Sequence, residues 1–202
     1  MFETLNRWDT QAFLWVNHHD CTVLDWVMWV LSQHWSFALV VAAATLPLLF
    51  RREEGRLGVR RTWWMALAGV ALCFLLADQG SVHLFKDTVC RLRPCHALEG
   101  VRMFRTHCGG QYGFVSSHAA NAFALVSFIL LTLKAYASTK CHTYVAIALI
   151  VWAVATCYSR AYLGKHYPGD LLCGALFGVL VGWLVWMIFK WVEKKMQKNE
   201  TK

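Results

Sequence analysis

An arginine, a histidine and an aspartate occur at short fixed spacing between two long apolar runs, at Arg160, His166 and Asp170. Pro168 and Gly169 break the preceding helix, so Asp170 can open the next helix and reach the imidazole of His166. A carboxylate on one ring nitrogen fixes the tautomer and leaves the lone pair of the other nitrogen free. Such a histidine can act as a base or a nucleophile, and the guanidinium suits phosphate oxygens. A polar loop exposed to solvent and lipid headgroups is an equally good interpretation of this segment alone.

The elements that must position these residues are predicted to be membrane-spanning helices. Charged residues make up only 16% of the chain and hydrophobic residues 57%, which is too apolar for an ordinary soluble domain. Leu171–Phe189 carries no ionisable side chain other than Cys173, and residues 26–50 carry only His34. The net charge of +8 is spread between the apolar runs rather than gathered in one patch, which argues against nucleic acid as a partner. We therefore predict an all-α integral membrane helical bundle.

The chain begins with two segments that each allow two interpretations. Residues 1–20 are predicted to form an interfacial helix lying on the bilayer, or else a cap packed on the bundle. Thr22–Phe50 is longer than one span requires. It is either a single tilted helix or a short surface helix to Gln33 followed by a span from Trp35.

Four further spans are predicted, which makes about five in total. Together with the N-terminal segment and a basic tail at 190–202 they form one domain over residues 1–202, with a motif-bearing core at 62–190. The predicted spans are Thr62–Phe85, Ser116–Leu133, Thr143–Tyr158 and Asp170–Val192.

The order of these spans assigns the polar segments to two sides of the membrane. The connector 51–61, the turn 134–142 and the tail are separated from one another by two spans each, so they share one side. All three are basic, which makes that side cytoplasmic. Segments 86–115 and 159–169 then meet at the outer surface, where an anionic substrate would explain their arginines and histidines.

Two further motifs join the first one on this surface. Lys86 and Arg93 are seven residues apart and share one face if the helix continues past Phe85, while Pro94 is compatible with its termination. The segment Ser116–His118 opens the next span, where hydroxyls, free backbone N–H groups and the helix dipole favour an anion. Each cation taken singly is also explained as a residue that extends its charge to the lipid headgroups.

The three motifs together read K-x6-R-P, S-x-H and S-R-x5-H-x3-D. This pattern resembles the type 2 phosphatidic acid phosphatase (PAP2) superfamily, which also includes vanadium haloperoxidases, over roughly residues 62–190. The second motif departs from the family, because Val115 and Ser117 stand where the family has proline and glycine. Ser117 still offers its backbone N–H to a phosphate when its side chain points away.

The resemblance implies that His166 attacks phosphorus to form a phosphohistidine, with Asp170 orienting its ring. It implies that His118 protonates the leaving oxygen and then helps to activate water. Phosphoryl transfer spreads negative charge over the equatorial oxygens, which cations and helix-terminal N–H groups can stabilise, so no metal or other cofactor is expected. The residues implied to surround those oxygens are Lys86, Arg93, Ser116, Ser117 and Arg160.

The remaining polar residues of the outer segments receive no catalytic assignment. Three arginines are predicted to form a rim that attracts anionic headgroups, namely Arg91, Arg102 and Arg105. Asp78 near the outer end of its span is left unassigned. Ser159 is interpreted as a structural hydrogen-bonding residue.

The outer loop contains three cysteines, two of which have an adjacent histidine. A zinc site formed by Cys95, Cys108 and those histidines is conceivable, but adjacent Cys-His pairs are poor tetrahedral chelates. Because an oxidising outer face favours a bridge, we predict a Cys95–Cys108 disulfide and a free thiol at Cys90.

The expected function is hydrolysis of a lipid phosphate at the outer leaflet of a bacterial inner membrane, with the active site facing the periplasm. Undecaprenyl diphosphate and the phosphate of lipid A are the leading substrates, ahead of phosphatidate and phosphatidylglycerophosphate. A non-catalytic lipid-binding protein and a haem-binding electron carrier are the alternatives from other classes. The carrier requires histidines facing each other within spans, whereas His118 and His166 fall at span ends and His34 and His142 are isolated.

Overall fold

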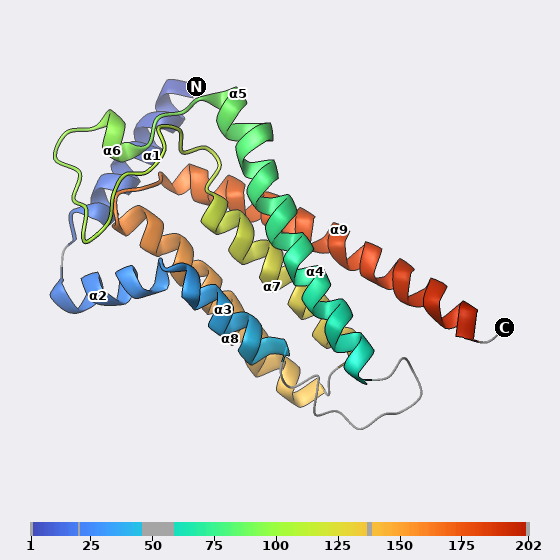
Figure 1. Ribbon diagram of the computed structural model, residues 1–202. Helices are drawn as coiled ribbons and strands as arrows, with labels where there is room; N and C mark the ends of the chain where they lie inside the picture. Colours follow the sequence, from blue (N-terminus) through green and yellow to red (C-terminus); the bar gives the residue numbers. More distant parts are fainter. Residues whose placement is uncertain (1, 20, 46–58, 137–138, 201–202) are drawn as a thin grey trace.

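The computed structural model describes residues 2–19, 21–45, 59–136 and 139–200 (Figure 1). In these residues the chain is a bundle of helices, with one isolated antiparallel bridge between Leu92 and Tyr112. In chain order the helices are α1 (Phe2–Asn17), α2 (Thr22–Leu31), α3 (His34–Thr45), α4 (Val59–Gly80), the π-helical turn η2 (Ser81–Lys86), α5 (Asp87–Val89), α6 (Pro94–Ala97), α7 (Ser117–Tyr136), α8 (Thr139–Tyr162) and α9 (Pro168–Glu200).

The predicted fold class is confirmed. Four helical segments of the described chain are long and apolar enough to cross a membrane, and the bent pair α2–α3 makes a fifth if it counts as one span. The axes of that pair differ by 67°, as a surface helix followed by a span requires. Ser36 stabilises the bend, because its hydroxyl donates to the carbonyls of Leu31 and Gln33. The span begins at His34, one residue before the predicted start.

The other predicted helices are all present but longer than expected. The second predicted span continues past Phe85 through η2 and ends at Val89. Helix α8 extends to Tyr162, which places Ser159 and Arg160 in its last turn rather than in a loop. The basic tail continues α9 to Glu200. Most of the connector 51–61 lies outside the described residues.

Helix α7 lies at the centre of the bundle and packs most closely on α9. Small side chains line the contact from both helices: Ala120 and Ala124 on α7 are fully buried, and α9 carries glycine at every fourth position from Gly174 to Gly182. A Cβ atom at Gly178 would overlap the carbonyl of Ala120, so this approach requires glycine. The beginnings of the two helices are joined directly, since the N–H of Ser116 donates to the carbonyl of Asp170.

Helix α1 packs across the end of the bundle that carries α5 and α6 (Figure 1). Phe13 and Asn17 are fully buried against the bundle, while Trp8 and Trp15 on the opposite face are 59% and 65% exposed. The helix therefore caps the bundle, as the second interpretation predicted, and presents an aromatic face outward, as an interfacial helix would.

Candidate active site

A cavity of about 1150 Å³ lies between α3 and α4 and reaches the beginnings of α7 and the last turn of α8. Its walls along α3 and α4 are mostly apolar, with Phe37, Val41 and Val70 among them. Its polar end collects residues from all three sequence motifs, which lie far apart in the chain: Lys86, Arg93, Ser117, His118, Arg160 and His166. The structure thus confirms that segments 86–115 and 159–169 meet.

His166 is positioned by a tight reversal between α8 and α9. Gly164 adopts a left-handed conformation with φ of 78°, and a Cβ there would lie 2.9 Å from the carbonyl oxygen of Arg102. Pro168 then begins α9, where its missing N–H has no cost. Asp170 caps this helix, because its Oδ2 accepts the backbone N–H of Tyr167 at 3.1 Å. The local sequence therefore places the imidazole and the carboxylate side by side.

The imidazole of His166 is buried and faces both an acid and a cation. Its Nδ1 lies 3.7 Å from Oδ2 of Asp170, which is longer than the expected hydrogen bond. Its Nε2 accepts a hydrogen bond of 2.8 Å from Nη1 of Arg93. Burial, followed by the charges of Arg93, Arg160 and Lys86, holds the pKa of His166 well below its ordinary value. The ring is therefore neutral at physiological pH, and the lone pair of Nε2 accepts the hydrogen bond from Arg93, so phosphorus must take the place of that N–H when this nitrogen attacks.

His118 lies in the first turn of α7 and lines the same cavity. Its ring contacts the ring of His34 on α3, with centroids 5.1 Å apart, and that of Phe37 at 6.0 Å. His34 is isolated in the sequence, but the bend between α2 and α3 brings it to the cavity. No sequence signal marks this neighbour of the expected general acid.

The three expected phosphate-binding cations approach the cavity from different elements. Arg93 donates from Nε to the carbonyl of Gly110 at 2.6 Å, and burial lowers its pKa while Asp170 opposes the shift. Arg160 is 5% exposed and donates to the hydroxyl of Ser32. Lys86 donates to the hydroxyl of Ser117 at 2.5 Å. Gathering these charges at one buried site favours an anion among them.

The two serines at the start of α7 differ from their expected roles. Ser116 is fully buried, and its hydroxyl accepts the N–H of Ala119, so it caps the helix rather than lining the cavity. Ser117 lines the cavity, and its hydroxyl faces an expected phosphate-binding cation instead of pointing away from the site. Its hydroxyl contacts Lys86 and also Ser81, at 2.6 Å.

The three arginines predicted to form a rim have other partners. Arg102 forms an ion pair with Asp25, and the guanidinium of Arg105 lies 4.7 Å from the ring centroid of Trp26. Arg91 donates from Nη1 to Oδ1 of Asp170 at 2.8 Å, immediately behind His166. Its position two residues before Arg93 could have indicated that Arg91 lies near the site. Spacing alone does not reveal that it contacts the carboxylate of Asp170.

Lys165 is a further cation beside the site that the motif analysis did not select. Burial, followed by the charges of Arg160 and Arg93, lowers its pKa from the ordinary lysine value to about 8. Bound phosphate oxygens would oppose this shift, because an anion stabilises the protonated amine.

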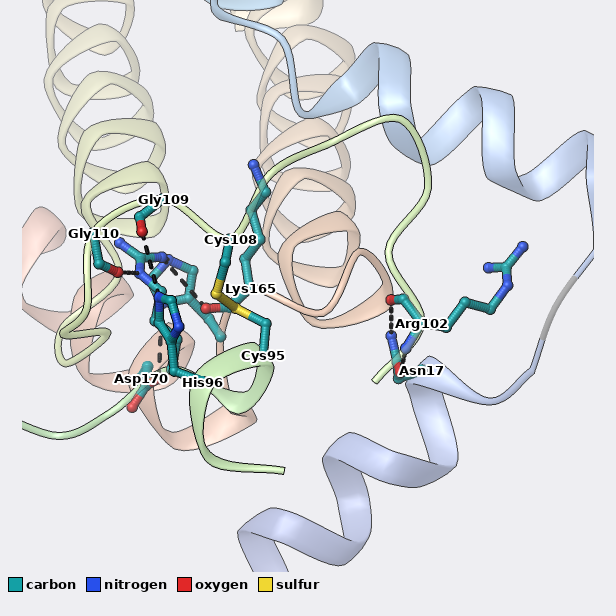
Figure 2. The surroundings of a disulfide bond; sticks show 11 residues. Asn17, Cys95, His96, Arg102, Cys108, Gly109, Gly110, Lys165 and Asp170 are labelled. Atoms are coloured by element: carbon teal, nitrogen blue, oxygen red, sulfur yellow. Dashed lines mark hydrogen bonds and ion pairs between the residues drawn. A yellow bond between two sulfur atoms is a disulfide. The ribbon is translucent and has the colours of Figure 1, made fainter. Parts of the chain in front are cut away.

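Cys95 and Cys108 form a disulfide, and Cys90 is a free, exposed thiol. The bridge joins the two segments that hold Arg93, since Cys95 follows Arg93 by two residues and Cys108 precedes Gly110 by two. Figure 2 shows the disulfide with Lys165 and Asp170 among the residues drawn around it. The bridge therefore fixes the loop that orients Arg93, one of the expected phosphate-binding cations.

Replacing both Cys95 and Cys108 with serine is expected to lower the free energy of unfolding by about 3 kcal/mol, since the loop is no longer closed in the unfolded chain. Phosphatase activity should also fall, because Arg93 loses its anchored loop. Thermal unfolding in detergent micelles and phosphate release measure the two effects. Cys90→Ser is the control. An unchanged melting temperature in the double variant would contradict the stabilising role.

The family model of the PAP2 superfamily matches residues 63–194. The chain is 30% identical over 206 residues to a lipid A 4'-phosphatase of Bacteroides thetaiotaomicron, covering 98% of this chain and 84% of that protein. It is 27% identical to a lipid A 4'-phosphatase of Porphyromonas gingivalis, covering 93% and 75%. Among solved structures, a transmembrane PAP2-type phosphatidylglycerolphosphate phosphatase from Bacillus subtilis superposes with a TM-score of 0.68 at 21% identity, over 95% of this chain and 87% of that one.

Proposed function

The chain belongs to the PAP2 superfamily and is a membrane lipid phosphatase, and from this we propose that it hydrolyses a phosphate monoester of lipid A through a phosphohistidine at His166. One observation carries the mechanism: the cavity brings the neutral imidazole of His166 together with His118 and three cations at its polar end. The positive charge needed for phosphoryl transfer thus comes from the chain itself.

The proposed first step is attack of Nε2 of His166 on phosphorus. The N–P bond forms while the bond from phosphorus to the lipid oxygen breaks, and His118 gives that oxygen a proton. Arg93 already contacts Nε2, so a phosphate arriving there is placed against its guanidinium. Arg93, Arg160 and Lys86 then stabilise the charge on the non-bridging oxygens.

In the proposed second step, water attacks the phosphohistidine. His118 is now deprotonated and takes the proton from that water, so the oxygen–phosphorus bond forms as the nitrogen–phosphorus bond breaks. Inorganic phosphate and the original neutral imidazole of His166 result. Asp170 supports both steps by stabilising the charge that the His166 ring carries while it is phosphorylated.

The shape of the cavity supports a lipid as the substrate. From the cationic end the cavity continues between α3 and α4 to Thr45 and Trp63, and most of this wall is apolar. A lipid bound with its phosphate beside His166 would lay acyl carbons along this wall, where they stay out of water as they do in the bilayer.

Relatives favour lipid A among the possible lipids. Two similar proteins, one of them aligned over nearly the whole of this chain, are lipid A 4'-phosphatases. Undecaprenyl diphosphate is the second candidate, since the same cation set would accept its terminal phosphate. The phosphatidylglycerolphosphate phosphatase matches in fold, and at 21% identity that likeness does not extend to the substrate.

We place the site at the periplasmic face of a bacterial inner membrane. Helix α6, which follows Arg93, and the start of α9, which follows His166, lie at the end of the bundle with α1, while the last part of α9, which carries the lysines after Phe189, extends to the other end (Figure 1). Basic segments remain on the cytoplasmic side, which supports this orientation.

A panel of four lipids tests the assignment with the purified full-length chain in mixed micelles. We expect phosphate release from bis-phosphorylated lipid A with a kcat/KM at least about tenfold above those for undecaprenyl diphosphate, phosphatidylglycerophosphate and phosphatidate, as differential binding of one substrate by 1.4 kcal/mol gives. Mass spectrometry of the product identifies the phosphate removed. Release only from another lipid would contradict the substrate assignment, and release from none would contradict the enzyme.

A further inference from the structure

Two charged side chains stand in line behind the His166–Asp170 pair. Nη1 of Arg91 lies 2.8 Å from Oδ1 of Asp170, and Nη2 of the same guanidinium lies 2.7 Å from Oδ2 of Asp9 on α1. Neither Arg91 nor Asp9 lines the cavity in the described structure. Asp170, Arg91 and Asp9 therefore form a row of charges, which reaches the catalytic pair from the side away from the substrate.

Side chains of α1 form hydrogen bonds to Arg91 and to the turn that carries Asp170. Oδ1 of Asp9 accepts the backbone N–H of Gly169 at 2.7 Å, and a Cβ at Gly169 would lie 2.8 Å from the other oxygen of Asp9. Asn6 accepts a second hydrogen bond from Arg91 at 3.0 Å. The guanidinium also lies 4.1 Å from the ring centroid of Tyr167. The carboxylate of Asp9 thus contacts both Arg91, which pairs with Asp170, and the backbone N–H of Gly169 next to Asp170.

The physical need for such partners follows from burial. Asp170 is fully buried, and an isolated carboxylate in that position would be strongly destabilised as an anion. Arg91 supplies the compensating charge. Burial opposes the charge on Arg91, but Asp170 and Asp9 together raise its pKa above the ordinary arginine value. The three groups therefore form one alternating row of charges.

We infer that Arg91 and Asp9 are positioning residues for the reaction, which fix the rotamer and the ionisation of Asp170 and, through Asp170, the imidazole of His166. This inference rests on the proposed function, because it assigns a role to groups behind the proposed nucleophile. It gives α1, which lies outside the family-matched residues 63–194, a direct part in the active site.

The row should control the proton affinity of the His166–Asp170 pair. The pair is faced from the cavity side by Lys86, Arg93, His118 and Arg160, and from the other side by Asp9, Arg91, Tyr167 and Cys173. Removing the cation of Arg91 makes protonation of the pair easier, whereas removing the anion of Asp9 makes it harder. The two changes therefore have opposite signs.

The acidic limb of the pH profile of kcat/KM measures this affinity, because protonation removes the nucleophile. We expect Arg91→Gln to move the limb to higher pH and Asp9→Asn to move it to lower pH. Each should lower kcat by about 10- to 100-fold with little change in KM, the size found when an outer partner of an active-site ligand is lost. Arg91→Lys keeps the charge and should restore the limb while recovering only part of kcat.

Glu3→Gln on the exposed side of α1 is the matched control and should behave as the wild type. The inference would be overturned if the acidic limbs of the variants stay at the wild-type pH. It would also be overturned if both limbs move in the same direction in step with the melting temperature. If Arg91→Gln does not fold, the Asp9→Asn and Arg91→Lys variants decide by themselves. A wild type without phosphate release overturns the proposed function and this inference with it, whereas an active wild type with unshifted variants overturns the inference alone.

Discussion

His166→Ala is expected to lower kcat for lipid phosphate hydrolysis by at least about 10³-fold, since the variant has no nucleophile to form the covalent intermediate. The cations remain, so lipid binding should persist. The structure gives this imidazole two features that suit the role: its pKa is held well below the ordinary value by burial and by three cations, and it lines the cavity beside those cations. Release of inorganic phosphate measures the loss.

A second measurement separates loss of the nucleophile from loss of structure. Wild-type protein quenched during turnover of ³²P-labelled lipid should carry a label that is stable in base and labile in acid, as a phosphohistidine is, and His166→Ala should carry none. His83→Ala is the control, because its ring is exposed and contacts only the nearby Asp87 among the partners described for it. A His166→Ala variant that is labelled, or that keeps activity within tenfold of wild type, would contradict the mechanism.

His118→Gln is expected to show a loss that depends on the leaving group. Hydrolysis of the lipid should slow by about 10²- to 10⁴-fold, because the departing lipid oxygen needs a proton that glutamine cannot supply. The p-nitrophenolate of p-nitrophenyl phosphate is a stable anion that leaves without protonation, so hydrolysis of this substrate should slow far less. The position of His118 in the cavity supports this assignment.

Comparison of the two substrates distinguishes an acid from a residue that only supports the cavity. Loss of support would slow both reactions equally, and that result would contradict the role of His118. Its ring packs on Phe37 and His34, so glutamine, which is of similar size, limits collapse of the wall. The wild-type ratio of the two rates serves as the reference for the variant.

The fold class could be predicted because it depends on local composition. Uncharged runs of membrane-spanning length occur throughout the sequence, and a helix is the structure that satisfies their backbone groups within a bilayer. The ends of helices were less predictable. Ser159 and Arg160 continue α8. The hydroxyl of Ser159 donates to the carbonyl of Thr156, and Arg160 donates to the hydroxyl of Ser32.

The outer loop shows why residue spacing does not assign partners. Lys86 and Arg93 were expected on one helical face, but the helix ends at Val89 and Cys90 takes a left-handed conformation with φ of 51°. The chain after this reversal leaves the helix, and Arg91 and Arg93, two residues apart, both reach the His166–Asp170 pair: Arg91 meets Asp170 and Asp9, and Arg93 meets His166. Of the two, only Arg93 lines the cavity among the described residues, and spacing alone does not predict that.

The sequence by itself determined the kind of protein and the chemistry available to it, because apolar run lengths and the residue types of the three motifs are local properties. It indicated His166, Asp170, His118 and three cations as one set. Only the tertiary structure decided that Asp9 and His34 lie beside that set, and that the hydroxyl of Ser117 turns toward Lys86. These contacts join segments separated by tens of residues, and they depend on how helices dock, which composition and spacing do not specify.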